Sequence, residues 1–489
     1  MDRSNDRRSE RSITGSDFLQ LTIGDAPAGG RADWLAEQLR QAIAQQRLPI
    51  GSRLPASRIL AAELQVSRGV VTEAYRRLTE DGQLAGRGRA GTVVVATPVS
   101  VGPDSAPRPP STAVFATTPD AASFYALRAA PARIDLSPGL PDLAAFPRAA
   151  WLRAERAALD ELTPADFGYG DAQGAPAFRA AITNWLARTR GIRVSPDEVI
   201  VVAGVAQAFA LLARVLRADG IAAIGVEDPG SLGGRQQLQS WGMATPPIPV
   251  DGSGLDVDLL RAANLPAVML TPAHQFPTGV VLDGNRRREL LRWADDGGLI
   301  IEDDYDAEHR YDRPPVPALR AMAAEQICYT GSVSKLLAPA LRVGWLIVPA
   351  RYHEAVAAAK RDADLGNAVL AQLVLARLME SGELERQLRY VRRRHRRRRD
   401  AMIEAIEHHL PTARVHGAAA GLHLMITFEA PFDDIALAAA ALARGVKVHP
   451  LSWHAQRPGP PGLVLGYAAT PPNDISAGIA AVADALRAI

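Results

Sequence analysis

The run 331–344, GSVSKLLAPALRVG, holds one lysine and one arginine among small and apolar residues. Lys335 follows the hydroxyl residues Ser332 and Ser334. Arg342 lies seven positions after the lysine. A lysine whose pKa is lowered by burial and neighbouring charge condenses with aldehydes, while arginine and hydroxyl groups bind phosphate. This combination suits a phosphorylated carbonyl compound, and pyridoxal 5′-phosphate (PLP) is the obvious candidate.

A lone lysine is most often a solvated surface side chain, so Lys335 needs support from other residues. The upstream stretch 299–306 is LIIEDDYD, an apolar strand that ends in acids and a tyrosine. Ligands of α/β proteins bind at the carboxyl ends of strands. We therefore expect Asp303 to pair with a protonated pyridine nitrogen and Tyr305 to hydrogen-bond the ring hydroxyl oxygen. The same acids could ligate a hard cation, but they lack calcium-loop spacing, so a metal site is disfavoured.

The motifs EDDYDAEHRY, GSVSK and ALRVGW resemble the fold-type I aminotransferase domain of the MocR (GabR-like) regulators. These regulators are a branch of the GntR family of bacterial transcription factors. The resemblance extends from about residue 31 to the C-terminus and rests on many separated motifs. It implies that Lys335 forms an aldimine with PLP, that Asp303 faces the pyridine nitrogen and that Arg342 binds the phosphate.

Composition places limits on the class of protein. A length of 489 residues suggests two to four domains. The single cysteine, Cys328, excludes an internal disulfide and a cysteine metal cluster, as expected in a reducing cytoplasm. No apolar run approaches the roughly 18 residues that span a membrane, so we expect a soluble cytoplasmic protein. The net charge is only +2, so any binding of nucleic acid must come from local basic patches.

The N-terminal part of the chain predicts a DNA-binding domain. Residues 1–17 are charged and serine-rich, and we expect them to be disordered. Within 18–97, apolar residues recur at helical spacing from Trp34, in 57–64 and after Ser67, a plausible N-cap. The next stretch, DGQLAGRGRAGTVVVA, predicts a β-hairpin. Two short helices followed by a hairpin indicate a winged helix-turn-helix.

This region, RLPASRILAAELQVSRGVVTEAYRRLTEDG, resembles the GntR winged helix along its whole length. The resemblance implies that the third helix enters the major groove of a double-stranded DNA operator, while the wing reaches the minor groove or the backbone. The residues that we expect to contact DNA are Arg58, Ser67, Arg68, Thr72, Arg76, Arg87 and Arg89.

Residues 98–131 contain seven prolines among Ser, Thr and Ala, and we expect an extended linker. From 132 to 489, apolar strands alternate with amphipathic helices, which is typical of a mostly parallel α/β sheet. The expected fold is therefore multidomain: a winged helix, then an α/β fold-type I aminotransferase-like domain. Its large subdomain is expected at about 150–350 and a small C-terminal α+β subdomain at about 351–489.

Further residues of the cofactor site are expected near the phosphate and the ring. The strand EVIVVAG ends at Gly204, and the next helix offers the free backbone N–H groups of Val205 and Ala206 to phosphate. By resemblance, Tyr169 reaches the phosphate of the partner subunit's cofactor; otherwise it is an ordinary turn aromatic. His274 is expected to orient the ring or a neighbouring side chain, although a packed histidine is as plausible.

Three positions depart from an amino-acid-handling site. By resemblance, Ser231 replaces an aromatic residue that stacks on the ring, and Phe276 replaces an asparagine. Val464 replaces the arginine that grips a substrate carboxylate. These departures favour a regulator over an enzyme. Arg457 or His454 could substitute for the missing arginine.

The densest basic run in the chain is 386–399, RQLRYVRRRHRRRR. It is interpreted as a solvated helix of the small subdomain, with a second DNA-facing patch as the alternative.

The sequence thus predicts a PLP-binding transcription regulator, and the resemblance implies that two chains form a head-to-tail homodimer. The effector is expected to be PLP itself, as in PdxR-type activators of vitamin B6 synthesis. Two alternatives remain: a regulator that senses an amino acid or amine as an external aldimine, and a working aminotransferase.

Overall fold

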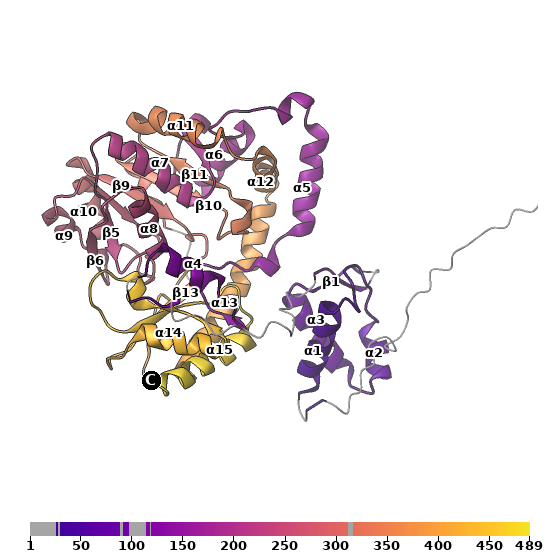
Figure 1. Ribbon diagram of the computed structural model, residues 1–489. Coiled ribbons are helices and arrows are strands. Elements are labelled where there is room, and N and C mark those ends of the chain that lie inside the picture. The colour runs from indigo at the N-terminus through magenta and orange to yellow at the C-terminus, as the bar shows by residue number, and fades with distance from the viewer. Residues whose placement is uncertain (1–25, 28–29, 89–90, 97–113, 118, 312–315) are drawn as a thin grey trace, which may run out of the picture. The chain divides into compact units, whose positions relative to one another are not determined.

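The computed structural model describes residues 26–27, 30–88, 91–96, 114–117, 119–311 and 316–489 (Figure 1). The chain divides into two compact units, Met1–Arg108 and Pro109–Ile489, and each is described by itself. Within the described ranges, no helix combines the length and the apolar character that crossing a bilayer requires.

The first unit is a winged helix-turn-helix, as predicted. Its elements are α1 (Arg31–Ala44), α2 (Ser57–Glu63), α3 (Arg68–Glu80), β1 (Leu84–Gly86) and β2 (Thr92–Val94). The antiparallel pair β1 and β2 forms the wing. The buried core is made by the apolar faces of the three helices, including Leu35, Leu39, Ile43, Val71 and Leu78. Ser67 takes the N-cap position of α3, but its side chain makes no capping hydrogen bond.

The second unit is built on an eight-stranded sheet with the order β4-β11-β10-β9-β8-β5-β6-β7. Strands β5, β6, β8, β9 and β10 are parallel, and β11 runs antiparallel between β10 and β4. The strands are β4 (Val199–Val202), β5 (Gly225–Asp228), β6 (Pro247–Asp251), β7 (Gly254–Leu255), β8 (Ala267–Leu270), β9 (Leu299–Asp304), β10 (Ile327–Ser332) and β11 (Gly344–Ile347).

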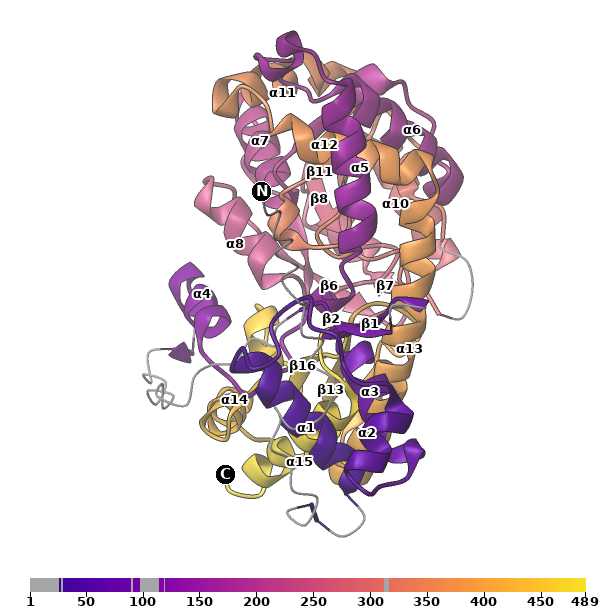
Figure 2. The same ribbon diagram turned by 90° about the vertical axis from the view of Figure 1, so that its right-hand side faces the viewer.

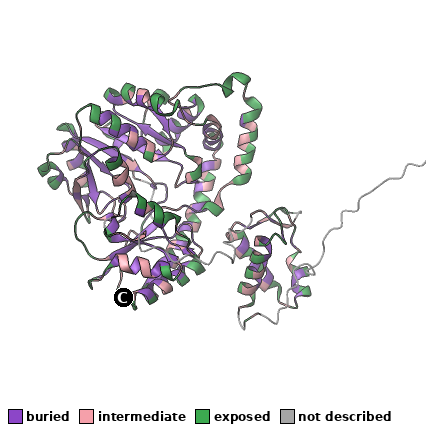
Figure 3. Ribbon diagram, in the orientation of Figure 1, coloured by how far each residue is buried: buried purple, intermediate pink, exposed green. Residues whose placement is uncertain are grey.

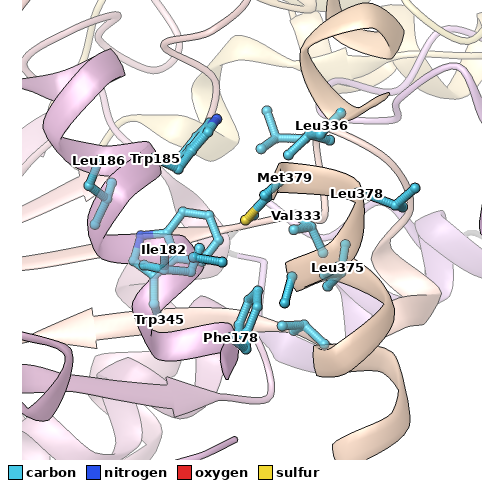
Figure 4. Close-up of a cluster of buried hydrophobic side chains, with 14 of the residues drawn as sticks. Phe178, Ile182, Trp185, Leu186, Val333, Leu336, Trp345, Leu375, Leu378 and Met379 are labelled. Atoms are coloured by element: carbon cyan, nitrogen blue, oxygen red, sulfur yellow. The ribbon is translucent and has the colours of Figure 1, made fainter. Parts of the chain in front are cut away.

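Helices cover both faces of this sheet because successive strand side chains point to opposite sides. Cys328 packs under α7 and α11, whereas Tyr329 packs under α6 and α12. Figure 4 shows part of the second cluster, including Phe178 of α6 and Leu375 of α12. The helices of this unit up to residue 380 are α4 (Ala121–Ala129), α5 (Arg148–Glu161), α6 (Pro176–Arg190), α7 (Val205–Ala218), α8 (Leu232–Ser240), α9 (Val257–Ala262), α10 (Gly284–Asp295), α11 (Ala350–Asp364) and α12 (Val369–Glu380).

A smaller antiparallel sheet, β12-β13-β16-β15, forms the C-terminal part of the unit. The helices α13 (Glu383–His409), α14 (Asp434–Ala443) and α15 (Pro472–Leu486) pack with it around a second core. The strands are β12 (Arg414–His416), β13 (His423–Thr427), β15 (His449–Pro450) and β16 (Gly462–Gly466), with a separate parallel pair of β3 (Ile134–Asp135) and β14 (Val446–Lys447).

Two expected boundaries differ from the structure. The expected linker 98–131 is not extended at its C-terminal end, because Asp120 caps the helix α4 and Leu127 packs in an apolar cluster. The subdomain boundary expected near 351 is also too early. Helices α11 and α12 pack on the large sheet, and the long helix α13 contributes to both cores. Helical periodicity does not reveal which core a helix packs against.

Candidate ligand-binding site

The carboxyl ends of neighbouring strands bring the predicted site residues to one edge of the large sheet. β9 ends next to Tyr305, and β10 ends at Ser332. These strands run parallel and side by side, so their ends meet. They open onto a cavity of about 360 Å³. Seven predicted residues line it: Val205, Ala206, Asp303, Tyr305, Ser332, Ser334 and Lys335.

Lys335 lies in the wall of this cavity. Its Nζ donates a hydrogen bond to the carbonyl oxygen of Gly139 over 2.6 Å. Desolvation, followed by the charge of Arg128, lowers the pKa of the Lys335 amine to about 8, although Asp306 and Asp303 oppose this shift. A larger fraction of the amine is therefore neutral, and nucleophilic, near pH 7 than in a solvated lysine.

Asp303 faces the same cavity from the end of β9. Desolvation, with the charge of Asp304, raises the pKa of the Asp303 carboxyl to about 7, while Lys335 opposes the shift. Its Oδ1 is buried and has no hydrogen-bond partner among the residues that the structure describes. A protonated pyridine nitrogen would supply this partner and favour the charged carboxylate. The donor set at this end of the cavity thus fits the ring of PLP.

His274 acts on the cavity through Tyr305. Its Nδ1 lies 3.0 Å from the Tyr305 hydroxyl and 3.0 Å from Asp306 Oδ2. Among the described residues, His274 itself is not part of the cavity lining. Burial raises the pKa of the Tyr305 hydroxyl well above its usual range, so the group stays protonated. Of the two expected roles of His274, the contacts favour orientation of a neighbouring side chain.

The N-terminus of α7 is the predicted phosphate site, and its Val205 and Ala206 line the cavity. Gly204 caps the helix with φ 83° and ψ 173°, a conformation that residues with a Cβ rarely adopt. A Cβ at this position would lie 3.2 Å from Arg342 Nη1, so the arginine lies directly beside the helix start. Its guanidinium donates to the carbonyl oxygen of Ala203. Free backbone N–H groups and an adjacent arginine suit an anion.

The positions that depart from an amino-acid site differ in their relation to the cavity. Ser231 lines the cavity, and its hydroxyl accepts a hydrogen bond from Gly234 N as the N-cap of α8. Val464 is fully buried in an apolar cluster with Phe276. Arg457 binds Asp228 at 2.9 Å instead of lining the cavity. Of the two expected substitutes for arginine, only His454 reaches the cavity wall.

Several lining residues were not predicted from the sequence. Phe124 and Tyr125 come from α4, inside the segment expected to be an extended linker. Gln236 and Gln237 come from α8, and His449 from β15. The adjacent aromatic residues Phe124 and Tyr125 in a proline-rich segment were the one sequence signal for packing here, because aromatic side chains are usually largely buried. Helix α4 lies beside α8 in both views of the unit (Figures 1 and 2).

Tyr169 lies apart from the cavity of its own chain, with 94% of its surface exposed. Its contact with a partner's cofactor remains a prediction.

The basic run is divided between structural and exposed positions of α13. His395 and Arg398 are buried, and Arg394 and Arg398 bind Asp142 Oδ2 at 2.6 and 2.8 Å. The arginines on the outer face are Arg386, Arg389, Arg393, Arg396 and Arg397. Neither a solvated helix nor a DNA-facing patch describes the whole run, because Arg394 and Arg398 form ion pairs that hold α13 against the remainder of the unit.

The predicted DNA-contacting side chains of the first unit are exposed where the structure describes them; they are Arg58, Ser67, Arg68, Thr72, Arg76 and Arg87. Arg68 Nε donates to Ser57 Oγ at 3.3 Å. Arg76 pairs with Glu73 and Glu80, each at 2.6 Å, so DNA would have to compete with these carboxylates. Arg89 lies outside the described residues.

Comparisons with known proteins divide the chain at the same place. Residues 31–94 match the model of the bacterial regulatory proteins of the gntR family, and residues 133–475 match aminotransferase class I and II. The chain is 31% identical over 469 residues to the probable rhizopine catabolism regulatory protein MocR of Rhizobium meliloti, covering 93% of both chains. This chain is a MocR-type regulator of the GntR family. As in other family members, its helix-turn-helix domain implies DNA binding.

Another relative of this MocR-type regulator is the pyridoxine biosynthesis transcriptional regulator PdxR of Corynebacterium glutamicum. The two are 32% identical over 459 residues, which cover 92% of this chain and 95% of PdxR. Among solved structures, the kynurenine aminotransferase of Pyrococcus horikoshii in complex with PMP matches with a TM-score of 0.68 and 26% identity. That match covers 75% of this chain and 93% of the aminotransferase, which confirms the fold-type I domain.

Proposed function

We propose that PLP, bound covalently at Lys335, modulates the affinity of this regulator for its operator. The observation that carries the proposal is the buried, unpartnered Oδ1 of Asp303 in the cavity that also holds Lys335. When bound, PLP supplies a carbonyl carbon that condenses with primary amines. Lys335 would hold it, Asp303 would bind the ring nitrogen and Tyr305 the ring hydroxyl. Arg342 and the start of α7 would bind the phosphate.

PLP itself is the proposed effector, and control of vitamin B6 synthesis is the proposed role. The cavity offers no arginine at Val464 for a substrate carboxylate, which weakens the case for an ordinary amino acid. The 32% identity to PdxR, a regulator of pyridoxine biosynthesis, supports the same assignment. The protein is thus proposed to use the aminotransferase fold as a sensor instead of an enzyme.

Helix α4 is proposed to transmit the state of the cavity. Phe124 and Tyr125 line the cavity, and α4 directly follows the segment that leads in sequence from the DNA-binding unit. The segment before α4 is hydrogen-bonded to the remainder of the second unit, since Trp453 Nε1 donates to Ala116 O at 3.0 Å. A ligand shifts the equilibrium between two conformations of a protein only if it binds one of them more tightly. Contact between the ligand and α4 would make the affinity depend on the position of this helix.

A head-to-tail homodimer is proposed as the working form. Helix α5 has only one buried residue, Ala158, and presents much of its surface to solvent (Figure 3). Leu152 and Leu159 on this helix are 64% and 43% exposed. The nearby Phe167 is 69% exposed. Clustered exposed apolar residues mark interaction surfaces.

The test measures binding of the purified protein to DNA upstream of its own gene, with and without PLP. We expect PLP to change operator affinity in the wild type and to have no effect on Lys335→Ala. Borohydride reduction followed by peptide mapping should label Lys335 alone among the three lysines. Lys360 and Lys447 serve as internal controls, because they pair with Asp364 and Asp135. Equal operator affinity of PLP-loaded and PLP-free protein would falsify the proposal.

A second candidate function is the sensing of an amine in addition to PLP. The observation that favours it is the extension of the cavity beyond the cofactor residues, toward His449 and His454. A slow transaminase activity is tested in the same preparation by adding an amino donor together with a keto acid, since multiple turnovers would assign an enzyme.

A further inference from the structure

Two histidines form a polar part of the cavity wall. His449 and His454 are 4% and 2% exposed, and both line the cavity. Their rings stack, with centroids 5.9 Å apart and planes inclined by 19°. Gly230 N donates to the backbone oxygen of His454 at 2.8 Å, which holds this histidine in place.

Three of the four ring nitrogens of this pair have no hydrogen-bond partner among the described residues. Neither Nδ1 nor Nε2 of His454 makes a hydrogen bond of normal geometry, and Nδ1 of His449 has none either. The Gly230 backbone lies near enough to the His454 ring to raise its pKa slightly, but desolvation and the neighbouring His449 lower that pKa well below its usual range. Burial lowers the pKa of His449 to about 4. Both rings are therefore neutral near pH 7.

Aromatic rings pack against the pair, while charged groups act on it from outside the cavity lining: Asp135 and Lys447 on His449, and Arg235 on His454. Phe276 packs edge-on against His454 with centroids 5.1 Å apart, and Phe124 of α4 packs edge-on against His449 at 5.8 Å. Among the described residues that line the cavity, Lys335 is the only lysine or arginine. Arg235 donates to Trp453 O at 3.2 Å and does not line this cavity. Since no described arginine lines the cavity, a carboxylate beside the two histidines would lose its hydration without an arginine in direct contact.

We infer that His449 and His454 form a subsite for the uncharged polar end of a small primary amine with an apolar body. A buried ring nitrogen without a partner is costly, and a hydroxyl or amide group supplies both a donor and an acceptor. The amine of the ligand would face Lys335 and its cofactor, so the inference rests on the proposed function. It adds to that function the class of co-effector: amino alcohols or amino amides, and not free amino acids.

The test uses the full-length protein loaded with PLP, and leucinol and leucine as probes. The two amines share a carbon skeleton, but leucinol has a hydroxymethyl group where leucine has a carboxylate. Calorimetry measures both affinities after the absorbance of the lysine-bound cofactor has been recorded. We expect leucinol to bind roughly tenfold more tightly than leucine, and to change operator affinity. His454→Ala should weaken leucinol binding roughly 5- to 10-fold.

Two further variants separate a ligand contact from a packing role. His454→Gln keeps an amide donor and acceptor, so it should retain most of the leucinol affinity. His408→Ala removes an exposed histidine of α13 and should change nothing. Leucine binding as tightly as leucinol, with that affinity lost in Arg128→Ala, would assign the carboxylate to α4 and overturn the subsite.

The outcomes also distinguish this inference from the proposed function. Normal cofactor absorbance without leucinol binding overturns the subsite alone. Absence of that absorbance overturns the proposed function, and the co-effector role with it.

Discussion

Burial shifts the pKa values of Lys335 and Asp303 in opposite directions. Burial disfavours the charged form of each, which lowers the pKa of the Lys335 amine to about 8 and raises that of the Asp303 carboxyl to about 7. Without a ligand, the carboxylate has no partner for Oδ1. A cationic ring nitrogen would restore the charged form, so cofactor binding and the ionisation of Asp303 are expected to be coupled.

The first prediction concerns Asp303→Asn. The amide keeps the size of the side chain but cannot form a charge-assisted hydrogen bond with a protonated ring nitrogen. We expect the affinity for PLP to fall roughly 10- to 100-fold, because such bonds contribute about 1.5–3 kcal/mol. Equilibrium titration with PLP measures this effect, and Asp303→Glu is the charge-retaining control. Unchanged affinity in Asp303→Asn would remove the carboxylate from the cofactor site.

The second prediction concerns the pH dependence of PLP attachment. Only the neutral amine of Lys335 attacks an aldehyde, and Arg128, Asp303 and Asp306 are the charges that act on it. The rate should rise about tenfold per pH unit below the pKa of about 8 and level off above it. Stopped-flow absorbance measures the rate. A rise that continues to about pH 10 would indicate an ordinary solvated lysine.

At the scale of elements, helix α7 links the sheet to the phosphate end of the site. It runs from Val205 to Ala218, with Gly204 as its N-cap shortly after β4 and Asp219 as its C-cap directly before Gly220. Both glycines have positive φ, 83° and 84°. They differ in their surroundings, since a Cβ at Gly204 would contact Arg342, whereas a Cβ at Gly220 would meet no described atom within 4 Å.

The third prediction uses this pair of glycines. Gly204→Ala and Gly220→Ala should each lower the free energy of unfolding by roughly 1–3 kcal/mol, because alanine resists positive φ. Only Gly204→Ala should also weaken PLP binding, since it displaces Arg342 and the backbone N–H groups of α7. Chemical denaturation and PLP titration measure the two effects. Equal PLP affinity in both variants would contradict a phosphate site at this helix end.

At the scale of the whole molecule, the chain joins a DNA-binding unit to a ligand-binding unit. Such a regulator needs a way to place two DNA-binding units on one operator, and a homodimer provides it. The exposed leucines of α5 and the nearly fully exposed Tyr169 are consistent with a partner that covers this part of the second unit.

The fourth prediction tests this surface. The double variant Leu152→Glu with Leu159→Glu should weaken dimerisation roughly 100-fold or more, because each introduced charge would be buried at the interface. Sedimentation measures the dissociation constant. Met322→Glu changes an equally exposed apolar residue, 58% exposed, outside α5 and should have no effect. If both variants remain dimeric, the subunits pair through another surface.

The features of this protein that could be predicted from its sequence are those that leave a local sequence pattern. Apolar periodicity predicted the winged helix, and the strand that ends in Asp303 predicted a site residue at a sheet edge. Local patterns do not specify which distant segments pack together. Helix α4 was therefore missed, because the prolines before it indicated an extended chain while Phe124 and Leu127 pack against the C-terminal part of the unit.

The residue types near Lys335 thus predicted the class of ligand, since a lysine, an aspartate and a helix start suited to phosphate are each recognisable within one motif. Only the tertiary structure decided what surrounds that ligand. It turned Arg457 toward Asp228 and brought His454 to the cavity. Both residues lie in one short loop, and the direction of a side chain there depends on contacts with residues more than 200 positions away, which no local pattern encodes.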